Sequence, residues 1–571
     1  MLSYRKLAMR VLGRPLHTGG NDSPRPASQR AAAFILTAIM LTSLTAPAFA
    51  GTWSIENGNI TVKAGETGND VTQNNVTTKN DTNTIITNQN KDIASSNTVT
   101  IETNDKNDKV KVTLDNVNIN VGSDSGSALT SNGDVTLTLK GDNSLTGGNG
   151  GSGISSNGSL TISGGEKDSL TAQGGSGRSG IFSSGGVTIS GGSTVKATGG
   201  DASDKDASAG GSGILIFGSG SLTVSDSTVT ATGGNGGSAR GSHGGNGISG
   251  KGSLTVSGGT VTATGGDGCS GSYSDGGIGI SSSSGGVTIY GGTVTATGGK
   301  SGSGDYSNGG NGISSSGSLS ISGGTVTATA GSSSGSYGRD GITTSSSLTI
   351  SGGTVTANGG SGSYRGGSGI SSSDIELSGS LELTAKAGSP NGKALSQNGS
   401  ELDPNTFKEK LDPGANIITK DADGKVIDQV SSPRPVEPEG PVIPEESSSS
   451  SDSGSATPSA DGGSSTPSAP ASPLPGLTVT DKSGQHISYT SIRDNNVLSL
   501  RVGRFTASFR ISLATLRQLR AEGIETITFQ TILCSTTLSL DELLAMGGED
   551  AEVVLTHHIR SSTLTVGGKD V

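Results

Sequence analysis

A nine-residue segment, GGTVTATGG, occurs twice without change, at residues 258–266 and 291–299. It belongs to a longer unit that can be aligned on the dipeptide Gly-Ile, with successive units 27 to 34 residues apart. The aligned isoleucines are Ile154, Ile181, Ile214, Ile248, Ile280, Ile313, Ile342 and Ile370. Repetition at this period constrains the fold more than any other feature, because it is typical of chains that stack one supersecondary unit on the next.

Each unit predicts three short strands. The segment SLTIS alternates apolar and polar residues, and TVTAT places Val and Ala on one side and three Thr on the other. This period of two gives a strand one inward and one outward face. The Gly pairs mark corners, where φ is positive or where two backbones approach closely. We expect an all-β fold, a right-handed parallel β-helix (β-solenoid) with coils of about 30 residues and about ten coils in total.

The composition fits a thin, shared core better than a compact one. The chain has 97 Gly among 571 residues and only 29% hydrophobic residues, less than a compact globule needs. A disordered chain is the alternative. The strict repetition argues against disorder, because stacked units can bury their few apolar side chains against one another.

The N-terminal segment has the three parts of a secretory signal. Basic residues up to Arg30 precede an apolar run at residues 31–44, and small residues stand at Ala48 and Ala50. Cleavage is expected after Ala50, so the protein is expected to be secreted or attached to the cell surface. An uncleaved anchor is the alternative, although the apolar run is short for a membrane span.

Composition and pattern divide the chain into six segments. The following ranges are expected: a signal peptide at 1–50, an N-terminal cap with early coils at 51–120, the β-helix repeats at 121–400, a C-terminal cap at 401–430, a Pro/Ser-rich linker at 431–476 and a small α+β domain at 477–571. In the last segment we expect a helix at Leu513–Ala521 and a second helix capped by Ser539. No partner for this segment is evident from its residues.

Charge and cysteine content exclude several classes of protein. A net charge of -11 disfavours a nucleic-acid binder. Cys269 and Cys534 lie far apart, which predicts neither a disulfide framework nor a zinc site. No apolar segment long enough to span a membrane follows the signal.

The repeats resemble the calcium-associated carbohydrate-binding β-helix domains of clostridial and gut-bacterial surface proteins. The stretch VTLDNVNI at residues 112–119 and the coils up to residue 387 carry this resemblance. It implies glycan binding and calcium held by acidic residues before Gly-Ile and before the second strand. In this chain only Asp340 keeps the first of these carboxylates and Asp134 the second. No cofactor is therefore expected, and calcium at these carboxylates is the alternative, since calcium needs six to eight oxygen ligands.

An enzyme is not expected. The β-helix is shared by polysaccharide lyases and hydrolases, which need clustered carboxylates for acid-base chemistry. Here the loop acids are single and scattered, as with Asp267, Asp275, Asp305 and Asp340.

Scarce tyrosines recur on one edge of the coils. Tyr273, Tyr306, Tyr337 and Tyr364 precede their own Gly-Ile isoleucines by 7, 7, 5 and 6 residues, although the chain has only 7 Tyr. The neighbouring candidates are His243, Arg240, Arg339 and Arg365. Aromatic faces stack on sugar rings, so this edge is the predicted ligand site. Alternatively, each Tyr only covers its own loop.

The functional hypotheses belong to different classes. The first is a non-catalytic protein that binds a polysaccharide or a host or plant glycan. The second is a structural or adhesive stalk that displays the C-terminal domain. The outward Thr rows of TVTAT could instead meet an ordered lattice such as ice, although Thr is also a good exposed strand residue.

Overall fold

The fold is available as a computed structural model, which describes residues 50–103, 109–203, 209–432 and 476–570. In the last range, 482–483, 486, 488, 495, 503, 505, 532–534, 547–550 and 559–561 are not described. Residues 1–49 of the predicted signal peptide (1–50) and residues 433–475 of the predicted linker (431–476) lie outside these ranges. In the described part of the chain, no helix is long and apolar enough to cross a membrane.

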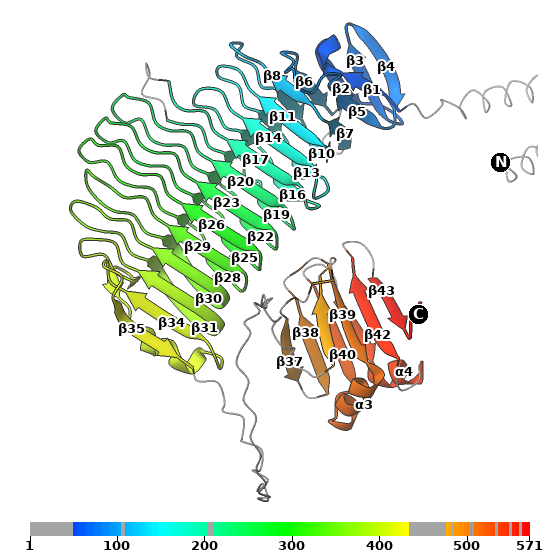
Figure 1. The fold of residues 1–571 in the computed structure, drawn as a ribbon, viewed down its shortest axis with the longest axis vertical. Coiled ribbons are helices and arrows are strands. Elements are labelled where there is room, and N and C mark those ends of the chain that lie inside the picture. Colours follow the sequence, from blue (N-terminus) through cyan, green and yellow to red (C-terminus); the bar gives the residue numbers. More distant parts are fainter. Residues whose placement is uncertain are drawn as a thin grey trace, which may run out of the picture. The chain divides into compact units, whose positions relative to one another are not determined.

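The repeats form a parallel β-solenoid, which confirms the predicted fold class. Figure 1 shows the coils stacked side by side, each with short strands joined by turns and by one long loop. Strands at equivalent places in successive coils pair in parallel, and they make three ladders.

The first ladder runs through the aligned isoleucines. Its strands are β2 (Ile60–Ala64), β6 (Val99–Glu102), β9 (Leu129–Asn132), β12 (Ile154–Asn157), β15 (Ile181–Ser183), β18 (Ile214–Ile216), β21 (Ile248–Gly250), β24 (Ile280–Ser282), β27 (Ile313–Ser315), β30 (Ile342–Asn358), β31 (Ile370–Lys386) and β32 (Leu395–Gln397). Within the described residues this ladder has twelve strands, so there are more coils than the ten expected.

The second and third ladders follow the SLTIS and TVTAT segments. The second contains β1 (Thr52–Ser54), β5 (Thr84–Thr87), β7 (Lys109–Asp115), β10 (Asp134–Lys140), β13 (Leu160–Ser163), β16 (Val187–Ser190), β19 (Leu222–Val224), β22 (Leu254–Val256), β25 (Val287–Ile289), β28 (Leu319–Ile321), β30 and β31. The third contains β8 (Asn118–Asn120), β11 (Asp142–Thr146), β14 (Ser169–Gln173), β17 (Thr194–Thr198), β20 (Thr228–Thr232), β23 (Thr260–Thr264), β26 (Thr293–Thr297), β29 (Thr325–Thr329), β30, β31 and β34 (Asn416–Lys420).

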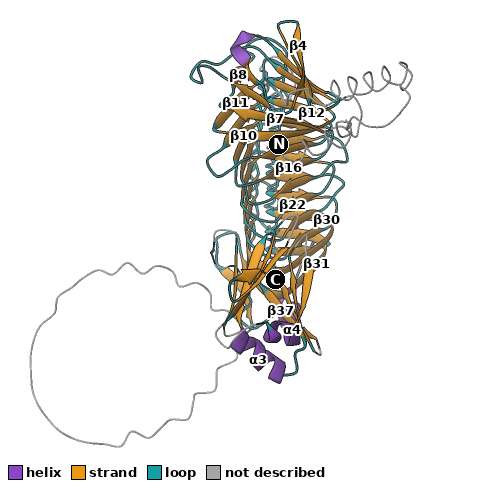
Figure 2. Ribbon diagram, turned by 90° about the vertical axis from the view of Figure 1, so that its right-hand side faces the viewer, coloured by secondary structure: helices purple, strands orange, loops and turns teal. Residues whose placement is uncertain are grey.

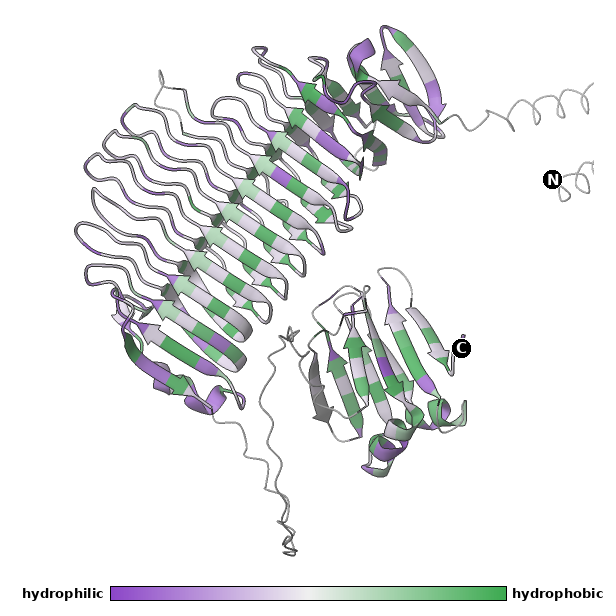
Figure 3. Cartoon of the chain, in the orientation of Figure 1, coloured by the Kyte–Doolittle hydropathy of each residue, from purple (hydrophilic) through white to green (hydrophobic). Residues whose placement is uncertain are grey.

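The alternation of side chains is as predicted. Val294 and Ala296 are fully buried, and Val294 lies between Val261 and Val326 of the adjacent coils. The outward Thr residues of β20, β23, β26 and β29 lie in register. Figure 3 shows the resulting apolar stripes, which follow the inward positions from strand to strand.

Additional elements flank the coils at both ends. At the start, η1 (Ile55–Asn57) follows β1, and β2 pairs antiparallel with β3 (Asn69–Gln73), which pairs antiparallel with β4 (Val76–Asp81). At the end, β33 (Ser400–Glu401) leads to η2 (Pro404–Lys410), and β34 pairs antiparallel with β35 (Val426–Ser431). The predicted C-terminal cap at 401–430 thus contains a 3₁₀ helix that starts at Pro404.

The C-terminal segment folds around a core of its own. One sheet has the order β36 (Leu477–Thr480), β39 (Ala507–Ser512), β42 (Glu552–His557), β43 (Ser562–Val566) and β44 (Lys569–Asp570). The other has the order β37 (Thr490–Asp494), β38 (Val497–Arg501), β40 (Thr526–Gln530) and β41 (Ser535–Ser539). The helices α3 (Leu513–Ala521) and α4 (Leu540–Ala545), purple in Figure 2, begin where the sequence predicts. Each is capped by a Ser side chain.

The burial pattern predicts very different effects for two adjacent residues. Val294→Asp puts a charge into a thin core and should lower the free energy of unfolding by about 3–5 kcal/mol. Thr295→Ser, on the outer face, should lower it by less than about 1 kcal/mol. Denaturant unfolding of both variants checks this. Equal losses would mean that the inward and outward faces are assigned wrongly.

Candidate functional site

Five long loops form a stacked layer beside the coils, which we call the wing. It consists of residues 233–247, 265–279, 298–312, 330–341 and 359–369, which connect the third ladder to the first (Figure 1). Each loop is hydrogen-bonded to the next from its base to its tip. For example, Gly236 N–H donates to Asp267 O (2.9 Å), and Gly244 N–H donates to Asp275 O (2.9 Å). The wing is thus an extension of the solenoid, although it lacks the apolar stripes of the strands (Figure 3).

The Gly pairs of the repeat allow the two arms of each loop to touch. Gly277 N–H donates to Gly266 O of the same loop (2.8 Å), and Gly266 N–H donates to Gly245 O of the preceding loop (2.8 Å). A Cβ atom on Gly277 would lie 1.9 Å from Gly245 O. No side chain fits such a contact, so close backbone approach explains these glycines. Positive φ explains others, such as Gly292 (φ 82°) at the corner before β26.

The four predicted tyrosines lie exposed in the wing. The exposed fractions of Tyr273, Tyr306, Tyr337 and Tyr364 are 44%, 62%, 52% and 74%. They form two stacked pairs. The ring centroids of Tyr273 and Tyr306 are 5.1 Å apart with an interplanar angle of 15°, and those of Tyr337 and Tyr364 are 6.2 Å apart with an angle of 29°. Each ring therefore covers more than its own loop, because it also contacts a ring in a neighbouring loop.

Stacking sets the direction in which these rings face. Tyr273 and Tyr306 are in successive coils, so the line between their ring centroids runs along the solenoid axis. The flat faces of the two rings therefore point along that axis. The guanidinium carbon of Arg240, from the preceding loop, lies 4.7 Å from the Tyr273 centroid. This cation–π contact therefore covers one outer face of the Tyr273–Tyr306 pair. A ligand alongside the wing meets the ring edges and hydroxyl groups more readily than the ring faces.

Two of the tyrosines have a backbone conformation that favours glycine. Tyr273 and Tyr306 have φ of 61° and 59°, and the equivalent residue one coil earlier is Gly241, with φ of 76°. The equivalence follows from the hydrogen bonds, since Gly241 N–H donates to Ser272 O and Tyr273 N–H donates to Asp305 O. A bulky side chain at positive φ is uncommon and costs about 1–2 kcal/mol. Such strain is found mainly at functional sites.

The other candidate residues of this edge differ in their contacts. Arg339 and Arg365 are exposed, and Tyr337 makes a parallel backbone bridge with Arg365. His243 instead takes part in the stacking of the wing, because its Nδ1 accepts the Asp275 N–H (3.1 Å). The structure therefore brings the tyrosines and arginines together and gives His243 a structural contact.

Acidic and amide side chains connect successive coils. Asp340, the predicted calcium ligand, accepts the Ser368 N–H (2.6 Å), and its own N–H donates to Asn311 Oδ1 (2.9 Å). Burial raises the pKa of Asp340. Asp134 likewise accepts the Ser159 N–H (3.1 Å). Among the described residues, no cluster of three or more His, Cys, Asp or Glu residues could hold a metal ion.

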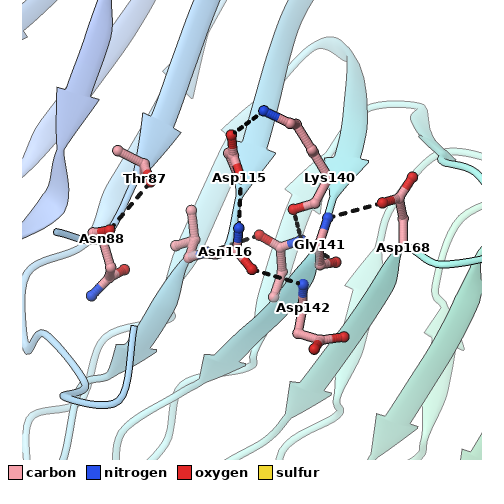
Figure 4. A network of polar contacts seen from close by, with 10 residues as sticks. Thr87, Asn88, Asp115, Asn116, Lys140, Gly141, Asp142 and Asp168 are labelled. Carbon is pink, nitrogen blue, oxygen red and sulfur yellow. Dashed lines mark hydrogen bonds and ion pairs between the residues drawn. The ribbon is translucent and has the colours of Figure 1, made fainter. Parts of the chain in front are cut away.

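The same kind of contact occurs in the early coils. Figure 4 shows Asn116 Oδ1 accepting the Asp142 N–H (3.3 Å) and Asp168 Oδ1 accepting the Gly141 N–H (2.9 Å). Lys140 and Asp115 add a surface ion pair between adjacent strands (2.7 Å). These polar side chains therefore serve coil-to-coil pairing at the corners.

A shallow depression of about 410 Å³ lies at the base of the wing. Its lining includes three Thr at strand ends and three other polar side chains, of which Asp267 is one of the scattered loop acids: Thr198, Thr232, Thr264, Asp201, Asn235 and Asp267. Here too the side chains bond along the stack, since Asp201 Oδ1 accepts the Asn235 N–H (2.7 Å). The recurrence of Asp or Asn directly after TGG was the sequence signal for this row.

Comparison of the chain with family models, with curated proteins and with solved structures finds no match.

The close packing of the wing predicts a position-specific effect of adding one methyl group. Gly277→Ala should lower the free energy of unfolding by about 1–3 kcal/mol, because the Cβ atom meets a backbone oxygen. Gly126→Ala is the control, since its Cβ would approach Val121 only to 3.8 Å. Calorimetric unfolding of both variants tests this. A Gly277 variant as stable as the control would contradict the close approach of the two arms.

Asp340→Asn distinguishes a structural carboxylate from a calcium ligand. The variant keeps the oxygen for the Ser368 N–H and removes a charge that burial disfavours. Because the folded-state pKa is raised, the natural chain loses stability relative to the variant as pH rises from the unfolded-state pKa through the folded-state pKa. We expect equal melting temperatures in acid and a more stable variant at neutral pH, measured by calorimetry.

Calcium titrations supply the second measurement for Asp340. Calcium should shift the melting temperatures of both proteins equally. A stabilisation by calcium that the Asn variant loses would make Asp340 a ligand.

Proposed function

We propose that the chain is a secreted, non-catalytic carbohydrate-binding protein whose ligand edge is the row of Tyr273, Tyr306, Tyr337 and Tyr364 at the wing. The observation that carries this proposal is the pair of exposed tyrosines at positive φ, where the preceding coil has Gly241. Keeping a ring there costs stability, which favours a role for the ring itself. The resemblance to carbohydrate-binding β-helix domains points the same way.

The stacked rings favour a particular mode of binding. An extended glycan along the axis would meet tyrosine edges, tyrosine hydroxyls and the nearby Arg339 and Arg365, which donate to sugar oxygens. The least covered ring is Tyr364, with 74% of its surface exposed. Contacts of about 0.5–1.5 kcal/mol per ring are weak singly, and a ligand spanning both pairs combines them. The ligand expected is therefore a polysaccharide or an extended host or plant glycan, and calcium is not required.

A second candidate function is a structural or adhesive stalk. It is favoured by the backbone hydrogen bonds that continue from the coils through the wing and by the Thr-rich outer face of the third ladder. In that case the tyrosine pairs would be stabilising contacts between coils, and the C-terminal domain would carry the recognition.

Replacing the rings separates these functions. Tyr273→Gly combined with Tyr306→Gly should keep or raise the melting temperature, because glycine suits a positive φ. The same change should weaken retention on the glycan bound by the natural chain by about fivefold or more, from two lost contacts. Retention is measured on plant cell-wall polysaccharides and on mucin glycans, with and without a chelator.

Tyr290→Ala is the matched control, because Tyr290 is 41% exposed on the same solenoid but lies outside the wing. It should leave retention unchanged. Unchanged retention of the double glycine variant would eliminate the tyrosine edge. If no glycan retains the natural chain, the stalk becomes the better proposal.

A further inference from the structure

A carboxylate with three neutral hydrogen-bond donors is buried in the first coil. Asp81, at the end of β4, is 0% exposed. Its Oδ1 accepts the N–H groups of Gly51 (2.9 Å) and Asn83 (3.1 Å), and its Oδ2 accepts the indole N–H of Trp53 (2.9 Å). Among the described residues, no basic side chain forms an ion pair with it. All three donors are neutral, although burial of a carboxylate favours a charged partner.

Gly51, one of these donors, is held in place from both sides. It is buried, and its carbonyl oxygen accepts the Ile85 N–H (2.9 Å) at the start of the β1–β5 pairing. The preceding residue, Ala50, is exposed. The first strand, β1, starts at the next residue, Thr52. The nitrogen of Gly51 therefore lies where the chain enters the fold, within hydrogen-bond distance of Asp81.

We infer that Asp81 is the binding site for the α-ammonium group created when the export signal is removed after Ala50. An endopeptidase that recognises small residues at 48 and 50 adds water across the Ala50–Gly51 bond. The Ala50 carbonyl carbon gains the oxygen and leaves as a carboxylate, and the Gly51 nitrogen gains protons and becomes an ammonium at neutral pH. The inference rests on the proposed export and is independent of glycan binding.

Removal of the signal would strengthen the hydrogen bond between the Gly51 nitrogen and Asp81. Before cleavage the Gly51 nitrogen is a neutral amide with one N–H for Asp81. Afterwards it is a cation at the same place, and charge-assisted hydrogen bonds are about twice as strong as neutral ones. The ammonium keeps access to water on the side that Ala50 occupied. Removal of the signal would thus stabilise β1 and its pairing with β5.

The test compares two chains of equal charge, one beginning at Gly51 and one beginning at Ala50, both ending at Val571. The second carries its ammonium one residue further out. Trp53 is the only Trp of the chain and touches Asp81, so its fluorescence reports unfolding of the first coil. We expect the chain starting at Gly51 to resist local unfolding about tenfold better, a difference of about 1.4 kcal/mol. Equal resistance would overturn the inference.

Asp81→Asn in both chains completes the cycle and should remove the difference. If the difference persists in the Asn variants, a group other than Asp81 causes it.

Because this substitution also alters the Trp53 contact, a second measurement uses the natural Asp81. The Gly51 amine should react with an amine-selective reagent at least about tenfold more slowly than the Ala50 amine. Equal rates would contradict a bound ammonium. N-terminal sequencing of the exported chain tests cleavage separately, and a start other than Gly51 would also overturn the inference.

Discussion

Parallel hydrogen bonding between successive coils is the interaction on which the rest of the structure depends. It sets one spacing for every strand, so inward side chains such as Val261, Val294 and Val326 lie directly over one another. Each coil contributes few apolar side chains, and only the neighbouring coils make their burial complete. The chain can therefore fold with little apolar content, provided that its register is kept.

The same spacing extends into the wing, where no apolar core supports it. Backbone hydrogen bonds hold the loops, and glycines allow their arms to meet, as between Gly277 and Gly266. Asp and Asn side chains at the coil corners accept N–H groups from the next coil. A carboxylate in this role, such as that of Asp340 or Asp134, already accepts an N–H group from the next coil.

A layer built in this way presents side chains in rows. The tyrosines stack because each loop repeats the previous one at the coil spacing, and their rings face along the axis for the same reason. Tyr273 and Tyr306 retain a strained backbone that a glycine would relieve. The exposed rings are thus present although they lower the stability of the fold, and this favours the tyrosine row as the ligand edge. Asp81 is a different case, since its place is explained by the residue at which the fold begins.

The sequence by itself determined the repeat, the three strands per coil, the inward positions and the two helices of the C-terminal domain. These features depend on local periodicity and capping, which neighbouring residues specify. It also placed the four tyrosines on one edge. Only the tertiary structure decided that their rings stack in pairs, that His243 and Asp340 bond along the wing, and that Asp81 meets Gly51. These contacts join residues of different coils, or residues brought together by the cap, and their geometry depends on how the loops stack. Local sequence patterns do not specify these contacts, so only the three-dimensional structure shows them.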